Sequence, residues 1–226
     1  MDLEYLKKYQ LKLAKKLKLE DKIDVKNVKF VAGIDTTFLD PYKEPTLAIS
    51  CIVVLNLEDF SVVETVFGQK EIDFPYIPTF LAFREIPSIM EAYQKLKSSP
   101  DVFILDGQGI LHPRKMGIAS HFGVITDTVS VGCGKSLLYG KYTQLENKPM
   151  AYSPVYADGE VRGYALRVKK NTNPIFVSPG NNISLNSSLY VIIKSINGYK
   201  LPEPVRLAHN FLTEYRKRLL QEVKNG

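Results

Sequence analysis

The sequence has no tryptophan, only two cysteines and three histidines among its 226 residues. Two cysteines cannot form a disulfide framework or a cysteine-based zinc site, so a reducing cytoplasm is the expected compartment. No apolar run approaches the ~20 residues that span a bilayer, so no membrane association is expected. The N-terminal stretch MDLEYLKKYQLKLAKKLKLE carries lysines throughout and lacks a continuous apolar segment, which excludes a secretory signal.

The composition is that of an ordinary globular protein, with 45% hydrophobic and 24% charged residues. Lysine and arginine number 30 against 24 acidic residues, which gives a net charge of +6. This excess permits a nucleic acid partner but does not require one, because much of it lies near the two ends, in KKYQLKLAKKLK and YRKRLLQEVK, where a solvated helix face explains it equally well. No internal repeat or low-complexity linker interrupts the chain, so residues 1–226 are predicted to form a single domain.

Hydrophobic periodicity predicts a helix followed by three strands in the first third of the chain. The helix is expected over residues 2–19. The strands are expected at 28–38, 47–55 and 61–67, and the short polar loops between them favour an antiparallel meander.

The remainder alternates between helical and extended patterns. A helix over 81–97 should break or kink after Ile86, because Pro87 lacks the amide hydrogen that an interior turn needs. The later elements are a strand at 101–107, a helix at 115–126, a strand at 128–132, a hairpin turning at 158–160, a strand at 175–180, and helices at 184–196 and 204–224. This order predicts an α/β fold with a mixed sheet flanked by helices on both faces, of the ribonuclease H-like kind.

Three acidic residues are candidates for a metal site. Asp35 lies inside the apolar run VAGIDTTF, and Asp106 ends FILD, at the carboxyl edge where open α/β sheets bind ligands. With Glu85 of AFREIP they would supply the oxygen ligands that Mg²⁺ or Mn²⁺ prefers. The alternatives are that Asp35 faces solvent or caps a turn, and that Glu85 is a surface residue paired with Arg84 or Lys95.

The segment DGQGILHPRKMGIASHFG, residues 106–123, is the most unusual stretch of the chain. Gly107 and Gly109 allow positive φ and close approach of the backbone to another group. The segment also carries donors and positive charge suited to phosphate oxygens, in His112, Arg114 and Lys115. A tight strand-to-helix turn with a solvated basic end is the alternative, and the density of glycine and proline favours the functional interpretation.

Three further side chains have a functional and a structural interpretation. Tyr76 lies between two prolines in FPYIPTF, so it is either a rigid wedge for a base stack or the packed tyrosine of a stiff turn. His209 of RLAHNF can transfer protons near metal-bound water or be a structural helix residue. Lys135 of VGCGKS can contact a phosphate or lie on the surface, since the full phosphate-loop pattern is absent.

Together these motifs resemble one family, the endonuclease V nucleases directed at deoxyinosine. The resemblance rests on six motifs in the family's order, spanning roughly residues 28–215: VAGIDTTF, FPYIPTFLAFREIP, DGQGILHPRKMGIASHFG, VGCGKSLLYG, PIFVSPG and RLAHNF. It implies a ribonuclease H-like DNA repair endonuclease that requires Mg²⁺, with Mn²⁺ able to substitute. The implied reaction is a nick at the second phosphodiester bond 3′ to deoxyinosine, leaving a 3′-hydroxyl and a 5′-phosphate.

The resemblance also implies roles for individual residues. Asp35, Asp106 and Glu85 match the metal-binding and catalytic carboxylates, and His209 and Lys135 match further active-site residues. Tyr76 matches the aromatic of a strand-separating wedge, and the flipped base is expected in a pocket built largely from main chain. The implied substrate-binding residues are Tyr76, Pro75, Ile77, Pro78, Thr79, Leu81, Gly107, Gly109, His112 and Ile118.

The sequence departs from the family pattern at two positions. Thr79 stands where glycine commonly follows PYIP, and its side chain is expected to narrow the pocket. Gly134 stands where alanine is usual before the lysine of GCGKS. Neither change removes a catalytic group.

The expected partner is DNA containing deoxyinosine, bound by a monomer. Inosine-containing RNA is the alternative substrate. Another ribonuclease H-like nuclease, such as a resolvase, and a metal-free binder of damaged or branched nucleic acid are the rival functions.

Overall fold

The computed structural model describes residues 2–225, and all of its strands belong to one nine-stranded sheet. In chain order the elements are α1 (Leu3–Ala14), the short 3₁₀ helix η1 (Val25–Asn27), β1 (Phe30–Phe38), β2 (Thr46–Asn56), β3 (Val62–Ile72), α2 (Leu81–Tyr93), β4 (Val102–Asp106), α3 (Ile118–Thr126), β5 (Ser130–Gly134), β6 (Lys141–Tyr142), β7 (Ala151–Ala157), β8 (Glu160–Arg167), β9 (Ile175–Asn181), α4 (Leu185–Lys194) and α5 (Glu203–Asn225). Among these residues, no helix is both long and apolar enough to cross a membrane.

The sheet is mixed, with the strand order β3-β2-β1-β4-β5-β9-β8-β7-β6. The first three strands form the predicted antiparallel meander. β4 then pairs in parallel with β1, and β5 pairs in parallel with β4. The carboxyl ends of three central strands therefore meet at one edge of the sheet.

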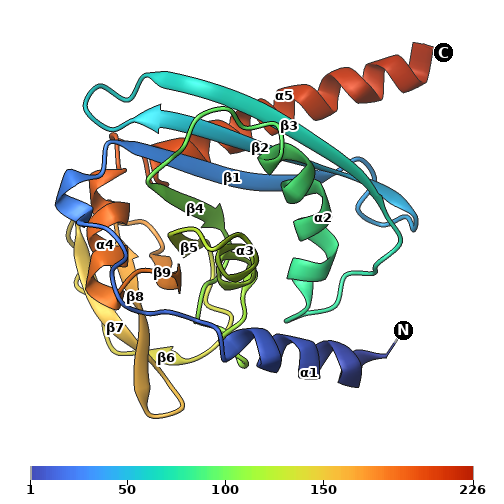
Figure 1. The fold of residues 1–226 in the computed structure, drawn as a ribbon. Helices are drawn as coiled ribbons and strands as arrows, with labels where there is room; N and C mark the ends of the chain where they lie inside the picture. Colours follow the sequence, from blue (N-terminus) through green and yellow to red (C-terminus); the bar gives the residue numbers. More distant parts are fainter. Residues whose placement is uncertain (1, 226) are drawn as a thin grey trace.

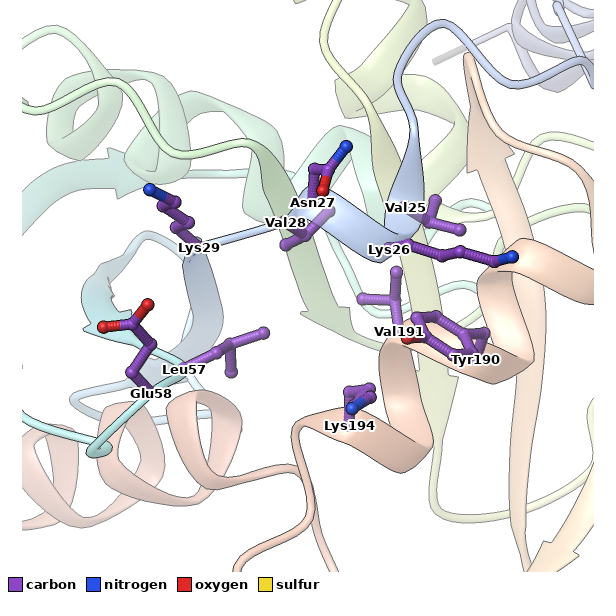
Figure 2. A pocket seen from close by; sticks show the side chains of 10 residues that line it. All are labelled: Val25, Lys26, Asn27, Val28, Lys29, Leu57, Glu58, Tyr190, Val191 and Lys194. Carbon is purple, nitrogen blue, oxygen red and sulfur yellow. The ribbon is translucent and has the colours of Figure 1, made fainter.

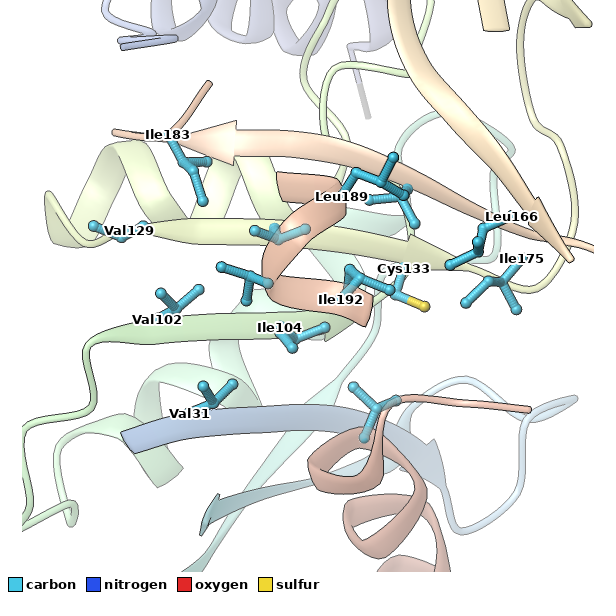
Figure 3. Packing of buried hydrophobic residues seen from close by; sticks show 14 of the residues in the cluster. Val31, Val102, Ile104, Val129, Cys133, Leu166, Ile175, Ile183, Leu189 and Ile192 are labelled. Atoms are coloured by element: carbon cyan, nitrogen blue, oxygen red, sulfur yellow. The ribbon is translucent and has the colours of Figure 1, made fainter. Parts of the chain in front are cut away.

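Helices cover both faces of the sheet, as predicted (Figure 1). α2 and α3 bury Ile86 and Phe122 against β1, β2 and β4 on one face. On the other face, α5 covers β2 and α4 covers the centre of the sheet, where Leu189 and Ile192 pack on a cluster that includes Val31 and Ile104 (Figure 3). Alternate residues of each central strand thus enter different cores, which explains why these strands read as continuous apolar runs.

Of the predicted break or kink after Ile86, the break is wrong, because α2 continues through Pro87 to Tyr93. A kink there stays a prediction. Proline in a helix interior costs about 3 kcal/mol. The helix buries Ala82, Ile86, Ile89 and Ala92 against the sheet, and burying one such large side chain stabilises by about 1.5–3 kcal/mol. Tertiary packing therefore outweighs the local penalty.

Several other boundaries differ from the predictions. The first helix ends at Ala14 instead of residue 19, because the chain then turns to pair with Asn182, whose amide donates to the Lys18 carbonyl at 2.7 Å. β3 extends five residues beyond the prediction, because it pairs with β2 as far as Ile72, which lies opposite Thr46. α3 begins at Ile118, and the two-residue strand β6 was not predicted.

Candidate active site

Two of the three predicted carboxylates lie side by side at the carboxyl edge of the sheet. The parallel register pairs Ile34 of β1 with Leu105 of β4, so the next residues, Asp35 and Asp106, are neighbours on the same face. The side chains of Asp35 and Asp106 are only 11% and 14% exposed. The alternative that Asp35 faces open solvent is therefore wrong.

The third carboxylate comes from α2, which covers the face of the sheet opposite to α5. Glu85 of α2 is 9% exposed and lines the same cavity as the two aspartates. Among the described residues its carboxylate has no hydrogen-bond partner. Arg84 donates instead to the carbonyls of Phe74 and Pro41, so the expected alternative of a paired surface glutamate is wrong. A buried carboxylate without donors is costly and favours an added cation.

The remaining catalytic candidates contact the aspartates directly. The Nδ1 atom of His209, from α5, lies 2.9 Å from Oδ2 of Asp35, whose Oδ1 accepts a hydrogen bond from the Thr36 amide. Lys135, just after β5, donates from Nζ to Oδ2 of Asp106 at 2.5 Å. The helix α5 and the loop after β5 thus each supply one basic group to this edge.

Burial and mutual repulsion raise the proton affinity of this cluster. Burial, reinforced by the negative charge of Asp106, raises the pKa of Asp35 to about 6, although Lys135 and His209 oppose this increase. Burial and then the charges of both aspartates raise the pKa of Glu85 well above its ordinary value. For Lys135, burial lowers the pKa, but the charge and hydrogen bond of Asp106 together with the charge of Asp35 outweigh it, and the net change is upward. The cluster is therefore short of positive charge.

These groups border a cavity of about 350 Å³. The described residues around it include eleven of the predicted site residues: Asp35, Tyr76, Pro78, Thr79, Leu81, Glu85, Asp106, Gly107, His112, Ile118 and Lys135. Four other predicted residues are not in its lining: Pro75, Ile77, Gly109 and His209.

The two glycines after Asp106 have different structural reasons. Gly107 has φ of +147° and lines the cavity, where a Cβ atom would lie 2.6 Å from the Ile118 side chain. Gly109 lies behind the cavity, where a Cβ atom would lie 1.9 Å from the Pro179 carbonyl oxygen. Gly109 is thus required by close packing, and a direct substrate contact by it stays a prediction.

His112 has a structural role in place of the phosphate contact suggested by its motif. Its Nδ1 accepts from the amides of Arg114 and Met116, so the proton lies on Nε2, which donates to the Thr79 carbonyl at 2.9 Å. Burial lowers the pKa of His112 to about 4. A neutral imidazole with both nitrogens engaged offers nothing to a phosphate.

The pocket was expected to use the main chain of residues such as Leu81 and Ile118, but two features of the cavity were not predicted. Gln108 of DGQG donates to the Ser136 carbonyl, while its Oε1 is buried without a partner among the described residues. The N-termini of α2 and α3 both open on the cavity without side-chain caps, and the amides of Leu81 and Ile118 have no partner in the described chain. The DGQG motif was a signal for the first feature, but the convergence of two helix ends has no signature in the sequence.

A second cavity, of about 420 Å³, lies near the amino end of β1 (Figure 2). Val28 and Lys29, which immediately precede β1, line it with Tyr190 and Lys194 of α4. Among its described lining residues, Glu58 is the only carboxylate. Of these two cavities, the carboxylate cavity is the one that gathers several acidic side chains, although the second cavity is larger.

The donor chemistry of the carboxylate cavity fits a divalent cation. Mg²⁺ and Mn²⁺ prefer carboxylate oxygens, and the unpartnered Glu85 beside Asp35 and Asp106 leaves negative charge to be balanced. Within residues 2–225, however, no group of three or more His, Cys, Asp or Glu side chains is arranged closely enough to hold a metal ion. The ligand types are thus in place, whereas a closed coordination shell is not.

Comparison with known proteins identifies the family to which this site belongs. The sequence model of Endonuclease V matches residues 11–210. An Endonuclease V of Dictyoglomus turgidum is 43% identical over 219 residues, which cover 97% of this chain and 91% of that protein. The chain belongs to the Endonuclease V family. It is thus an endonuclease, as the sequence motifs predict.

Solved structures of Endonuclease V have the same fold, which confirms the ribonuclease H-like prediction. The Bacillus subtilis protein superposes with a TM-score of 0.88 at 35% identity, covering 96% of this chain and 95% of the other. The Ciona intestinalis protein superposes with a TM-score of 0.81 at 27% identity, covering 98% of each chain. That structure is a complex with a 24mer DNA containing an inosine followed by a ribo-adenosine.

Proposed function

We propose that this endonuclease acts in DNA repair and nicks DNA at the second phosphodiester bond 3′ to a deoxyinosine, leaving a 3′-hydroxyl and a 5′-phosphate. The observation that carries the proposal is one cavity that Asp35, Glu85 and Asp106 share with four further lining residues, which we call the base slot: Thr79, Leu81, Gly107 and Ile118. The inosine-containing DNA bound by the Ciona intestinalis relative supports the same class of substrate.

The slot suits an extruded purine with acceptor atoms on its edge. Leu81 and Ile118 present free amides at the starts of two helices, and such amides bind electron-rich atoms. Hypoxanthine offers the O6 and N7 acceptors and lacks the exocyclic amine of guanine. Because leaving a polar group such as that amine unpaired costs about 1–3 kcal/mol, a slot that offers the amine no acceptor within reach would select against guanine.

Tyr76 is placed to assist extrusion of the base. Its side chain is 66% exposed, at the rim of the cavity and between two prolines. Proline restricts the backbone, so the main chain that carries the ring at this rim has little freedom to move. An inserted aromatic ring would replace part of the stacking that the DNA loses, which amounts to a few kcal/mol.

We assign Asp35, Asp106 and Glu85 as ligands of Mg²⁺, with Mn²⁺ able to substitute. Such an ion would supply activation of water and stabilisation of the leaving oxygen. His209 contacts Asp35 through Nδ1, and its other ring nitrogen, Nε2, exchanges a proton with the reacting groups. Lys135, now bound to Asp106, presents an ammonium to a non-bridging oxygen of the scissile phosphate.

Inosine-containing RNA is a second candidate substrate. The ribo-adenosine that follows the inosine in the Ciona intestinalis complex favours it. Oligonucleotides of one sequence, with deoxyribose or ribose on the 3′ side of the inosine, would separate the two functions by their relative rates of cleavage.

A nicking assay tests the main proposal. A duplex with one deoxyinosine and the same duplex with deoxyguanosine are incubated with Mg²⁺ or with EDTA, and the cut is mapped by gel electrophoresis. Asp106→Asn should lower the inosine-dependent rate by at least about 100-fold, a typical effect of removing a catalytic group. Asp59→Asn, in the exposed turn between β2 and β3, is the matched control. Equal nicking of both duplexes would refute the substrate assignment.

We also propose that residues 1–226 act as a single-domain monomer in the cytoplasm. The continuous nine-stranded sheet supports the single domain. Light scattering of the purified protein, with and without DNA, would test the monomer.

A further inference from the structure

Thr79, at the wall of the cavity, has a backbone conformation that its residue type disfavours. Its φ is +69°, in the left-handed region. Glycine adopts this region freely, whereas a β-branched residue there is a true outlier that the surrounding structure must hold.

The hydrogen bonds that hold this conformation converge on the carbonyl oxygen of Thr79. The Thr79 carbonyl accepts hydrogen bonds from Nε2 of Gln10 at 3.1 Å, from Nε2 of His112 at 2.9 Å and from Nη2 of Arg114 at 3.1 Å. The same Nη2 also donates to the Thr79 hydroxyl at 2.6 Å. Three donors on one carbonyl fix the orientation of the peptide that follows Thr79.

Gln10 ties this arrangement to the N-terminal helix. It is 0% exposed, and its Oε1 accepts from Nε of Arg114 at 2.6 Å while its Nε2 contacts Thr79. A fully buried glutamine on a short amphipathic helix is unusual, because polar side chains there normally face solvent. The helix α1 therefore contributes a polar strut to the cavity wall.

We propose that Gln10, His112 and Arg114 are positioning residues that act through Thr79 to hold one wall of the base slot. The helix α1 is thereby a part of the substrate site. The inference rests on the proposed function, since it takes the slot to be the site of the extruded base. The clamp, meaning these three side chains, holds a peptide in a conformation that glycine would adopt without help.

This reasoning makes the clamp dispensable when residue 79 is glycine. When residue 79 is threonine, Gln10→Ala removes one hydrogen bond to the Thr79 carbonyl and one that orients Arg114, which weakens the hold on the left-handed conformation. In a Thr79→Gly chain, the same backbone conformation is accessible without the clamp. The effect of Gln10→Ala should thus depend on the residue at position 79.

A double-mutant cycle tests this dependence. Gln10→Ala, Thr79→Gly and the double variant are compared with the natural chain by steady-state nicking of a deoxyinosine duplex. Gln10→Ala should raise KM about tenfold, the loss expected for two hydrogen bonds, with kcat changed less than about twofold. In the Thr79→Gly background, it should raise KM less than about threefold. Equal factors in both backgrounds, or a fall in kcat alone, would overturn the proposal.

Hydrogen exchange separates failure of the clamp from failure of the proposed function. Gln10→Ala should accelerate amide exchange in residues 74–80 of the natural chain, and much less in the Thr79→Gly chain, whatever the substrate is. Unchanged exchange in both would refute the clamp even if the enzyme nicks inosine DNA. Gln10→Met, which keeps the side-chain volume, provides a second variant if the alanine variant unfolds. Gln69→Ala, which removes a hydrogen bond to Tyr215 on the β3 edge, is the matched control and should leave KM unchanged.

Discussion

At the scale of single residues, the site depends on one carboxylate that the folded chain leaves without a partner. Glu85 is buried, and the charges of Asp35 and Asp106 add to the effect of burial in raising its pKa. Because the folded state holds this proton more tightly than the unfolded chain, ionisation destabilises the metal-free protein. This loss of stability develops as the pH rises above 4.5, the ordinary pKa of glutamate, towards the raised pKa of Glu85.

We therefore predict that Glu85→Gln increases stability while it removes activity. In EDTA at pH 8, the variant should gain about 1–2 kcal/mol of unfolding free energy, because glutamine removes a buried group whose ionisation the fold opposes. Nicking should fall at least about 100-fold. Urea unfolding and the nicking assay measure the two effects. Glu91→Gln, on the same helix and partly exposed, is the control; a Glu85→Gln protein less stable than the natural one at pH 8 would contradict the prediction.

At the scale of elements, the three helices on one side of the site meet at a buried histidine. His121 of α3 lies 6.0 Å from the ring of Tyr9 in α1 and 5.4 Å from that of Phe83 in α2. Its Nδ1 has no hydrogen-bond partner in the described chain, and burial lowers its pKa from 6.5 to about 4. The contact among α1, α2 and α3 therefore requires a neutral imidazole.

We predict that acidification weakens this contact between pH 6.5 and about 4. In that range the unfolded chain binds a proton that the folded chain rejects, so the stability contributed by His121 is complete above pH 6.5 and is lost as the pH falls. His121→Phe removes the group that titrates in this range. The stability of the natural protein relative to the variant should fall by up to about 1.4 kcal/mol per pH unit across the range.

Urea unfolding of both proteins at several pH values measures the difference in their stability. The carboxylates with raised pKa have the opposite effect, but they are present in both proteins and cancel in this difference. The comparison at pH 8 provides the baseline, and a difference that is constant from pH 8 to pH 4 would contradict the assignment.

The elements also show where local sequence rules lose to packing. Pro87 has every local property of a helix breaker, yet α2 continues because its apolar face covers the sheet. Residues 15–19 continue the helical pattern, yet the chain leaves the helix to bond with the end of β9. In both cases a partner distant in sequence decides, and no window of neighbouring residues contains it.

At the scale of the whole molecule, the net charge of +6 favours a polyanionic substrate without locating it. The carboxylate cavity and the cavity near the amino end of β1 each have a lysine that could contact such a substrate. Lys135 lies with the carboxylates at one end of the central strands, and Lys26 lines the cavity near the amino end of β1. Only the first can approach a scissile phosphate in the proposed complex.

We predict that affinity for inosine-containing duplex DNA falls steeply with salt. Each neutralised phosphate should contribute about −0.9 to the slope of log affinity against log salt concentration. Lys135→Gln should reduce the steepness of this slope by about one phosphate contact, whereas Lys26→Gln should leave it unchanged. Fluorescence anisotropy at four or five salt concentrations measures both, and an affinity independent of salt would refute the phosphate contacts.

The sequence alone determined the meander, the mixed sheet and the apolar runs of its central strands, and it nominated the three carboxylates, because hydrophobic patterning and residue chemistry are local properties. Only the tertiary structure decided that Glu85 reaches the site from the face opposite to His209, and that His112 supports Thr79 instead of a phosphate. Gln10 and Thr79 are 69 positions apart, and their contact depends on how α1 docks. Such contacts are set by the packing of whole elements, which no sequence motif contains.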